Sequence, residues 1–299
     1  MNAGGVLKQA MASERSAIYI ELTKPRITLM VLVTVAMGQF LASAAAPQPA
    51  LLLHALIGAA LACSGAGALN QYIERDTDSL MNRTRFRPLP AQKVSPMTVV
   101  ALGTALAIGG VAYTAVTVNT VAAAINALTV ATYLFVYTPM KRHSSLSTLA
   151  GAVPGALPPV IGWAAVDPNL GAGGWILFGI VFLWQIPHFL AIARLYRDDY
   201  ASGGFPMLAV MDDPGDLTGR MMVLYAAALV PVSSMLVVAG VAGTFYLFAA
   251  LALGAAYTAA AVVARRDETR EAARRLLLTS VAYLPLLFAA LVIDRWFGA

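Results

Sequence analysis

The sequence predicts an all-α polytopic membrane protein, folded as a single bundle of transmembrane helices. Of its 299 residues, 59% are hydrophobic and 12% are charged, and the mean hydropathy is +0.73. The apolar residues form continuous runs, whereas a porin-type β-barrel would alternate apolar and polar residues with period two. These runs are long enough to cross a bilayer, so the composition excludes soluble, disordered and coiled-coil chains.

A helix that crosses the hydrocarbon core needs about 20 apolar residues. Nine segments meet this requirement, namely 27–45, 51–69, 97–115, 119–138, 147–165, 174–193, 221–241, 244–263 and 276–293. We expect them to form one intramembrane domain over 27–299. A cytoplasmic N-terminal segment over 1–26 precedes this domain.

The loops between these segments alternate in charge, which predicts the orientation of the chain. With the N-terminus in the cytoplasm, 19 of the 20 Lys and Arg residues lie inside and only Arg295 lies outside. The positive-inside rule therefore predicts N-in, C-out. The net charge of +5 is explained by topology and needs no nucleic acid. The basic run between Arg265 and Arg275 is interpreted in the same way, with attraction to membrane lipid.

Proline and glycine break the predicted helices at two places. The densest cluster lies at 151–159, and Pro187 interrupts the sixth segment. Such breaks either kink a helix for packing or line a cavity, and the pattern does not separate the two. Gly65 and Gly67 have no strand before them, so they indicate close helix approach, not a phosphate loop. Cys63 is the single cysteine and has no partner for a disulfide.

Polar residues gather at the end of the second segment. Asn70, Glu74 and Asp78 occupy positions i, i+4 and i+8 and fall within about an 80° arc of one helix face, while Asp76 points elsewhere. Stacked carboxylates repel one another unless a cation lies between them, and Mg²⁺ accepts carboxylate and amide oxygens. The alternative is a solvated helix end whose acids pair with Arg75 and Arg83.

Three arginines follow at alternate positions, Arg83, Arg85 and Arg87. Guanidinium groups match the geometry of phosphate oxygens. Acidic residues that hold a metal and basic residues that hold an anion together make a diphosphate site. This interpretation therefore gains weight over that of a solvated helix end.

The run NQYIERDTDSLMNRTRFRPLP at 70–90 resembles the first signature of the UbiA superfamily of intramembrane prenyltransferases. That signature has Asn and two Asp at four-residue spacing, followed by an Arg-Thr-x-x-Arg-Pro-Leu block. Glu74 replaces the middle Asp, as in the branch whose acceptor is haem. Three further stretches, 137–142, 151–163 and 184–189, resemble the same branch, and the resemblance covers about residues 20–295.

The second acidic signature of the superfamily is only partly present. Asp198 and Asp199 are adjacent, and adjacent side chains on a helix point 100° apart. One carboxylate, Asp199, is therefore expected to serve the site. Whether one or two metal ions bind stays open.

The resemblance implies an enzyme that transfers a farnesyl group from farnesyl diphosphate to the C2 vinyl group of protohaem IX, with water added, to give haem O. The implied cofactor is Mg²⁺, held by Asn70, Glu74, Asp78 and Asp199. The diphosphate is expected at Arg83, Arg87, Lys141 and Arg142, although Lys141 and Arg142 also suit topology anchors. The implied surroundings are a bacterial inner membrane with the site toward the cytoplasm, and partners such as haem A synthase or oxidase assembly factors.

Three other functions share some of these features. A sister prenyltransferase for a quinone precursor has the same metal site, but the stretch at 184–189 favours haem. A secondary transporter also has broken helices, yet its charges lie near the midplane and these lie at one rim. A non-catalytic assembly partner of an oxidase needs neither half of a diphosphate site.

His188 lies inside an otherwise apolar segment, where a histidine must be satisfied. Pro187 frees a backbone carbonyl one turn earlier, and this carbonyl could accept a hydrogen bond from the imidazole in a purely structural role. The other interpretation is contact with the porphyrin, through the iron or a propionate. Because the stretch resembles the haem branch, contact with the porphyrin carries the same weight as the structural interpretation.

Overall fold

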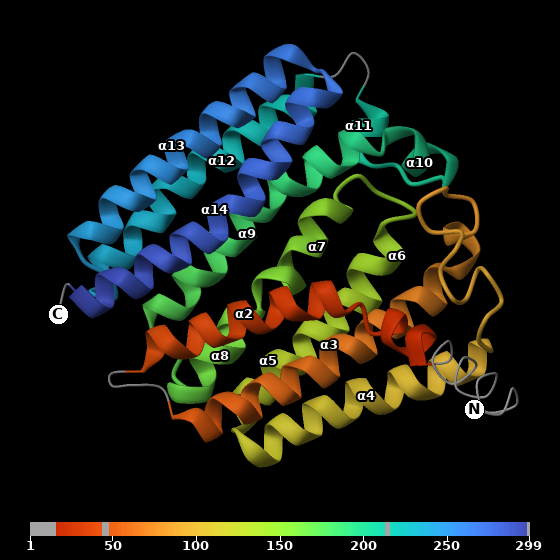
Figure 1. Ribbon diagram of the computed structural model, residues 1–299, viewed down its shortest axis with the longest axis horizontal. Helices are drawn as coiled ribbons and strands as arrows, with labels where there is room; N and C mark the ends of the chain where they lie inside the picture. The colour runs from red at the N-terminus through yellow and green to blue at the C-terminus, as the bar shows by residue number, and fades with distance from the viewer. Residues whose placement is uncertain (1–15, 44–47, 213–215, 298–299) are drawn as a thin grey trace, which may run out of the picture.

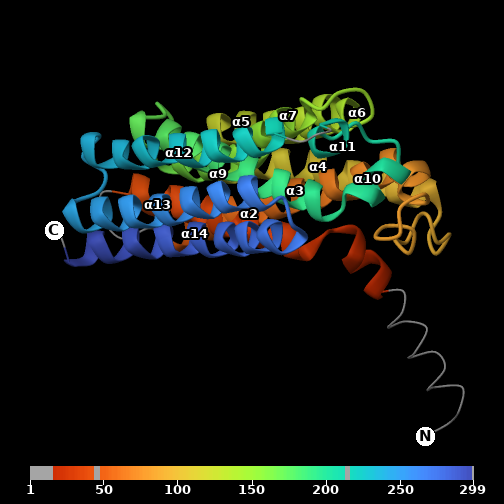
Figure 2. The same cartoon turned by 90° about the horizontal axis from the view of Figure 1, so that it is seen from above.

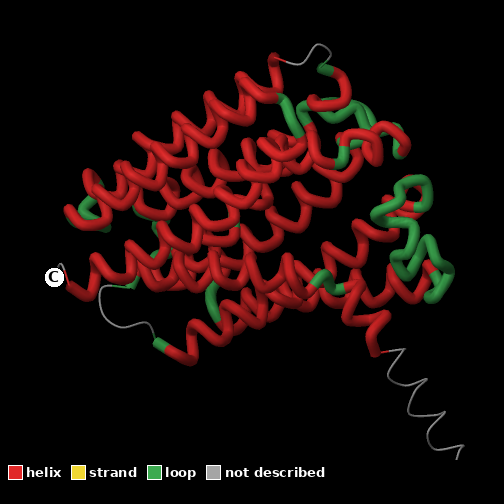
Figure 3. The backbone as a smooth tube through the Cα atoms, turned by 45° about the horizontal axis from the view of Figure 1, so that its top comes forward, coloured by secondary structure: helices red, strands yellow, loops and turns green. Residues whose placement is uncertain are grey.

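The computed structural model describes residues 16–43, 48–212 and 216–297, and all regular structure in this part of the chain is helical (Figures 1 and 3). The first half contains α2 (Pro25–Ala42), α3 (Pro49–Asp78), α4 (Pro96–Thr117), α5 (Thr120–Ala131), the π-helix η1 (Thr132–Tyr137) and α6 (Thr138–Met140). The second half contains α7 (Ser147–Ala156), α8 (Pro158–Val166), α9 (Ala172–Leu195), α10 (Arg197–Ser202), α11 (Leu208–Met211), α12 (Asp216–Val238), α13 (Thr244–Asp267) and α14 (Arg270–Phe297).

Nine stretches within the described residues are long and apolar enough to span a membrane, which confirms the predicted number. The ends differ where polar residues continue a helix beyond the hydrocarbon. The second span runs to Asp78 and the last begins at Arg270. At Pro187 the helix is not divided, because α9 continues through this residue from Ala172 to Leu195. Residues 1–15 of the predicted N-terminal segment lie outside the described residues.

The helices form two groups that run along a common axis (Figures 1 and 2). In one group α3 packs against α2 and α4, and α2 packs against α8. In the other, α12, α13 and α14 pack together and against α9, while α7 lies between the groups. The loop over 79–95 and α10 lie at one end of the bundle, which we call the polar end (Figures 1 and 2).

Small residues allow the helices of the first group to approach closely. A Cβ on Gly162 of α8 would overlap the carbonyl oxygen of Val35 on α2, and one on Gly65 would overlap the backbone of Ala107 on α4. The expectation that Gly65 serves helix packing is therefore confirmed. Close backbone approach of this kind is how membrane helices associate without a hydrophobic driving force.

The proline-rich break falls between α7 and α8, at Leu157. The span that contains it is the most buried of the nine, so the break is surrounded by protein and not by lipid. Glycines on α7 admit neighbouring side chains: Gly151 faces the ring of Tyr137, and Gly155 faces the amide of Gln185. These contacts support the packing interpretation of the break.

The last residues of α14 tie the opposite end of the bundle together. Arg295 donates to the carbonyls of Phe40 and Leu41 at 2.9 and 3.0 Å, at the C-terminus of α2. Asp294 accepts from the backbone N–H of Tyr246 at 3.0 Å, at the start of α13. Each charge thus faces the helix end of opposite polarity, where it stabilises the dipole.

Replacing Gly162 with Ala tests the α2–α8 contact. The added methyl group must displace backbone, so we expect a loss of about 1–3 kcal/mol in stability. A thermal unfolding series in detergent measures this as a lower midpoint. Gly109→Ala is the matched control, since a Cβ at Gly109 meets nothing within 4 Å. Equal midpoints for the two variants would contradict the tight contact.

Candidate active site

The polar face predicted on α3 exists and is buried. Asn70, Glu74 and Asp78 expose 1%, 4% and 1% of their surface. Asp76 points away, as expected, and forms an exposed pair with Arg75 at 3.6 Å. The predicted alternative, in which Arg75 and Arg83 pair with the site acids, is not what the structure shows. Burial at this level means that these polar groups need partners within the protein.

Each of the three side chains has one basic partner. Lys24 donates to Oδ1 of Asn70 at 2.6 Å, Lys141 donates to Oε1 of Glu74 at 2.7 Å, and Arg87 donates to Oδ2 of Asp78 at 2.7 Å. The bases come from three separate places: the residue before α2, the residue after α6, and the loop over 79–95. The polar end of the bundle thus brings together three cations and three oxygen-bearing side chains.

The cations lie on the accessible side of these pairs. Arg87 and Lys141 expose 24% and 16% of their side chains, whereas Asp78 and Glu74 expose 1% and 5%. An anion that approaches the site therefore meets the cations first. In this arrangement Arg87 holds one oxygen of Asp78 and Lys141 holds one oxygen of Glu74.

One oxygen of the site has no partner. Oδ1 of Asp78 is buried and, among the described residues, no group donates to it. A buried carboxylate oxygen left in this state is costly, and a divalent cation is a natural ligand for it. Together with the oxygens of Asn70 and Glu74, the donor set fits Mg²⁺, which takes few protein ligands and is completed by phosphate and water.

Lys24 is a site residue that the sequence analysis missed, because it was counted only as a topology charge. Its side chain runs over Gly67 of α3, which leaves room for the stem, and reaches Asn70. Its backbone is left-handed, with φ 50° and ψ 59°, a costly conformation for a residue with a side chain. Gln71 holds the preceding segment by donating to the carbonyl of Leu22 at 3.2 Å.

The surroundings of Lys24 lower its pKa. Burial lowers the pKa of Lys24 to about 7, and the positive charges of Arg87 and Lys141 act in the same direction. An anion bound among the three cations would oppose both effects.

Lys141 is positioned by the π-helix η1. Its Nζ lies 4.6 Å from the ring centroid of Tyr137, and Asn70 donates to the hydroxyl of Thr138 at 3.1 Å. Burial alone would lower the pKa of Lys141, but the neighbouring Tyr137 and Glu74 groups raise it above its ordinary value. Short π-helical segments are frequent at functional sites because they redirect side chains.

Asp199 and Arg83 meet at the rim, at some remove from the three pairs. The carboxylate of Asp199 accepts from the backbone N–H of Arg83 at 3.2 Å. The guanidinium of Arg83 lies over the rings of Tyr196 and Tyr200, at 5.5 and 5.9 Å. This contact joins the 79–95 loop to α10, which directly follows α9. Within the described ranges no three Asp, Glu, His or Cys side chains converge as a metal cage, so Asp199 is not grouped with Glu74 and Asp78.

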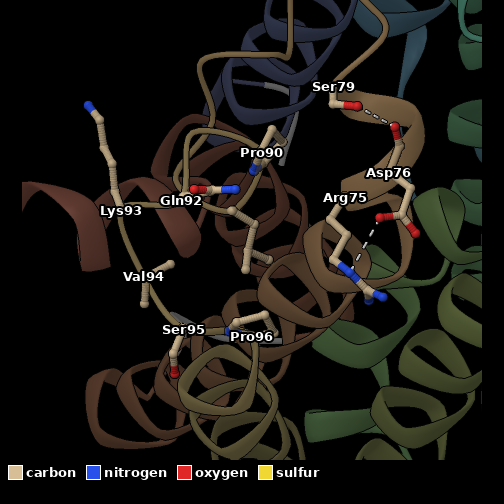
Figure 4. Close-up of a pocket in the computed structure, with 10 residues that line it drawn as sticks. Arg75, Asp76, Ser79, Pro90, Gln92, Lys93, Val94, Ser95 and Pro96 are labelled. Atoms are coloured by element: carbon tan, nitrogen blue, oxygen red, sulfur yellow. Dashed lines mark hydrogen bonds and ion pairs between the residues drawn. The ribbon is translucent and has the colours of Figure 1, made fainter.

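Arg142 and the rim pocket lie beside the site. Arg142 is exposed and donates to the carbonyl of Ile73 on α3 at 3.0 Å. A pocket between the end of α3 and the 79–95 loop is lined by Arg75, Asp76, Lys93 and their neighbours (Figure 4). None of the three buried side chains of the α3 face lines this pocket.

His188 is satisfied by another helix. Its Nδ1 lies 2.7 Å from the hydroxyl of Ser280 on α14, so its partner is not the carbonyl freed by Pro187. Its ring stacks on Trp184 at 5.1 Å. His188 lies on α9, which packs with α12 and α14, whereas the polar face of α3 lies in the other group of helices.

The sequence has close relatives. It is 44% identical over 289 residues to the protoheme IX farnesyltransferase of Solibacter usitatus (strain Ellin6076), covering 93% of this chain and 98% of that protein. It is 46% identical over 251 residues to the protoheme IX farnesyltransferase of Sorangium cellulosum (strain So ce56), covering 83% and 89%.

Solved structures share the fold. One described as concerning digeranylgeranylglyceryl phosphate synthase in membranes superposes with a TM-score of 0.79 at 15% identity, over 94% of this chain and 98% of that one. A UbiA homologue from Archaeoglobus fulgidus bound to GPP and Mg²⁺ superposes with a TM-score of 0.65 at 13% identity, over 92% and 99%. The model of the UbiA prenyltransferase family matches residues 31–290. The chain therefore belongs to the UbiA prenyltransferase family.

Proposed function

We propose that this protein transfers the farnesyl group of farnesyl diphosphate to the C2 vinyl group of protohaem IX, giving haem O and diphosphate. The observation that carries the proposal is the set of three cation pairs around a buried carboxylate with a free oxygen. The choice of acceptor is supported by relatives at 40–46% identity that are protoheme IX farnesyltransferases.

The residues divide into two roles in this proposal. Asn70, Glu74 and Asp78 would hold Mg²⁺ through their oxygens, and Asp199, which in this structure accepts from the backbone N–H of Arg83, would contribute from the rim. Lys24, Arg87 and Lys141 hold the diphosphate, and their present partners are released to the metal. Arg83 and Arg142 lie farther out and favour the approach of the anion by their charge.

The chemistry follows from this arrangement. The bond between the farnesyl C1 and the diphosphate oxygen breaks, and C1 bonds to the terminal vinyl carbon. Water then bonds to the inner vinyl carbon and a proton is released. Lys24, Arg87 and Lys141 stabilise the charge that develops on the leaving diphosphate, which is the largest electrostatic demand of the step. Bound Mg²⁺ would act there as a Lewis acid.

The membrane setting suits both substrates, which are hydrophobic. Apolar helix walls exclude stray water from the reacting centre. We place the site in a bacterial inner membrane, N-in and C-out, with the polar end toward the cytoplasm. The asymmetry of 19 inside against one outside among the basic residues supports this orientation.

Purified protein given protohaem IX, farnesyl diphosphate and Mg²⁺ is expected to form haem O, detected by mass spectrometry. Asp78→Asn should lower turnover by about 10³-fold, because it removes a charged metal ligand. Asp76→Asn is the matched control and should keep normal turnover, since Asp76 is exposed and pairs only with Arg75.

Two results would contradict the proposal. Full activity of Asp78→Asn at limiting Mg²⁺ would remove Asp78 from the metal site. Farnesylation of an aromatic quinone precursor in place of protohaem would assign the protein to a sister enzyme with the same metal site.

Orientation is tested with single cysteines in a Cys63→Ala background. Asn82 lies in the loop at the polar end and Asn169 lies between α8 and α9, and both are exposed. A membrane-impermeant maleimide added to intact cells should label Asn169→Cys, whereas Asn82→Cys should react only after the membrane is opened. Labelling of both from one side would disprove the nine-span orientation.

A further inference from the structure

One polar group lies inside the bundle and takes no part in the diphosphate site. His188 and Ser280 form a pair within the membrane-spanning part of α9 and α14. Around them, the indole N–H of Trp184 donates to the carbonyl of Ser280 at 2.8 Å, and Tyr257 donates to the carbonyl of Trp184 at 3.0 Å. Polar groups inside a membrane protein are costly and most often functional.

The hydrogen bonds of Ser280 decide which nitrogen of His188 carries the proton. The hydroxyl of Ser280 has one hydrogen, and it is donated to the carbonyl of Leu277 at 2.6 Å. Ser280 can therefore only accept from His188, so Nδ1 is the protonated nitrogen. In a neutral imidazole the lone pair is then on Nε2.

The imidazole ring of His188 is held in place by aromatic neighbours. Trp184 stacks on one face at an interplanar angle of 25°, and Phe189 contacts the ring edge-on at 5.7 Å. Nδ1 is bonded to Ser280, and among the described residues none is hydrogen-bonded to Nε2. The ring is therefore fixed with the lone pair of Nε2 unused by the protein.

The depth of His188 matches that of the diphosphate site. His188 lies seven residues before Leu195, about 10 Å from the end of α9, and Asn70 lies eight residues before Asp78, about 12 Å from the end of α3. Both helix ends lie at the polar end, where Arg83 and Asp199 join them. The helices belong to different groups, so the two sites are at similar depth on different walls of the bundle.

We propose that Nε2 of His188 is an axial ligand of the iron of the haem substrate, and that Ser280 is the positioning residue that fixes its tautomer. A histidine that binds a metal donates its other ring N–H to a neighbour, as Nδ1 does here. A propionate contact would need a donor, and Nε2 offers a lone pair instead. The inference rests on the proposed function, because it requires haem as the acceptor.

The test is to titrate the purified protein with ferric haem and to monitor binding by absorption and electron paramagnetic resonance spectroscopy. Wild-type protein should show nitrogen ligation of the iron. His188→Ala should lose this signature and bind haem at least about tenfold more weakly. His54→Ala is the matched control: His54 also lies in a span, is bonded to the hydroxyl of Tyr113 at 2.8 Å, and should leave the spectrum unchanged.

Iron-free protoporphyrin IX separates iron ligation from contact with the macrocycle, and its affinity is measured for both the wild-type protein and His188→Ala. The inference predicts that removing iron weakens binding to wild-type protein as much as His188→Ala weakens haem binding. Equal losses of haem and protoporphyrin affinity in His188→Ala would overturn it. An unchanged haem spectrum in that variant would also overturn it.

The proposed function is tested separately, by measuring whether the wild-type protein forms haem O. If haem O forms while the haem spectrum does not depend on His188, the inference fails and the proposed function stands. If wild-type protein neither binds nor farnesylates haem, both fail.

Discussion

The structure depends on one electrostatic constraint, the pairing of Asn70, Glu74 and Asp78 on α3 with one basic side chain each. Uncompensated charges at 1–5% exposure would be strongly destabilising. Lys141 and Arg87 remove that cost for Glu74 and Asp78. The same cations are the groups that a diphosphate requires. The pairs thus stabilise the protein without substrate, and in the proposed function they are exchanged when substrate binds.

The fold serves this exchange by bringing the partners from elements far apart in the chain. Close packing through glycines aligns α2, α3 and α8, so that Lys24 reaches α3 across 46 residues. The π-helix turns Lys141 inward, and the rim contact between Arg83 and Asp199 holds the 79–95 loop that carries Arg87. The proposed acceptor side lies separately, on α9 and α14, where His188 and Ser280 meet.

The length of the apolar runs was enough to predict the nine spans, and helical periodicity was enough to predict the face shared by Asn70, Glu74 and Asp78. It could not predict Lys24, because a lysine at the start of a span is explained equally well by topology. It also missed the partner of His188, which is 92 residues away on another helix. It also could not tell whether Pro187 would divide its span, and α9 continues through this residue. A local sequence pattern predicts helices and their polar faces, whereas the partners of individual side chains depend on tertiary packing.

The central claim is that the acids reach the metal only when a diphosphate draws their basic partners away. Calorimetric titration of the wild-type protein with Mg²⁺, alone and with a non-hydrolysable farnesyl thiodiphosphate, tests this most directly. The account predicts coupling, with Mg²⁺ binding at least about tenfold more tightly in the presence of the analogue, equivalent to about 1.4 kcal/mol. Mg²⁺ that binds the free protein with the same affinity as the complex would contradict it.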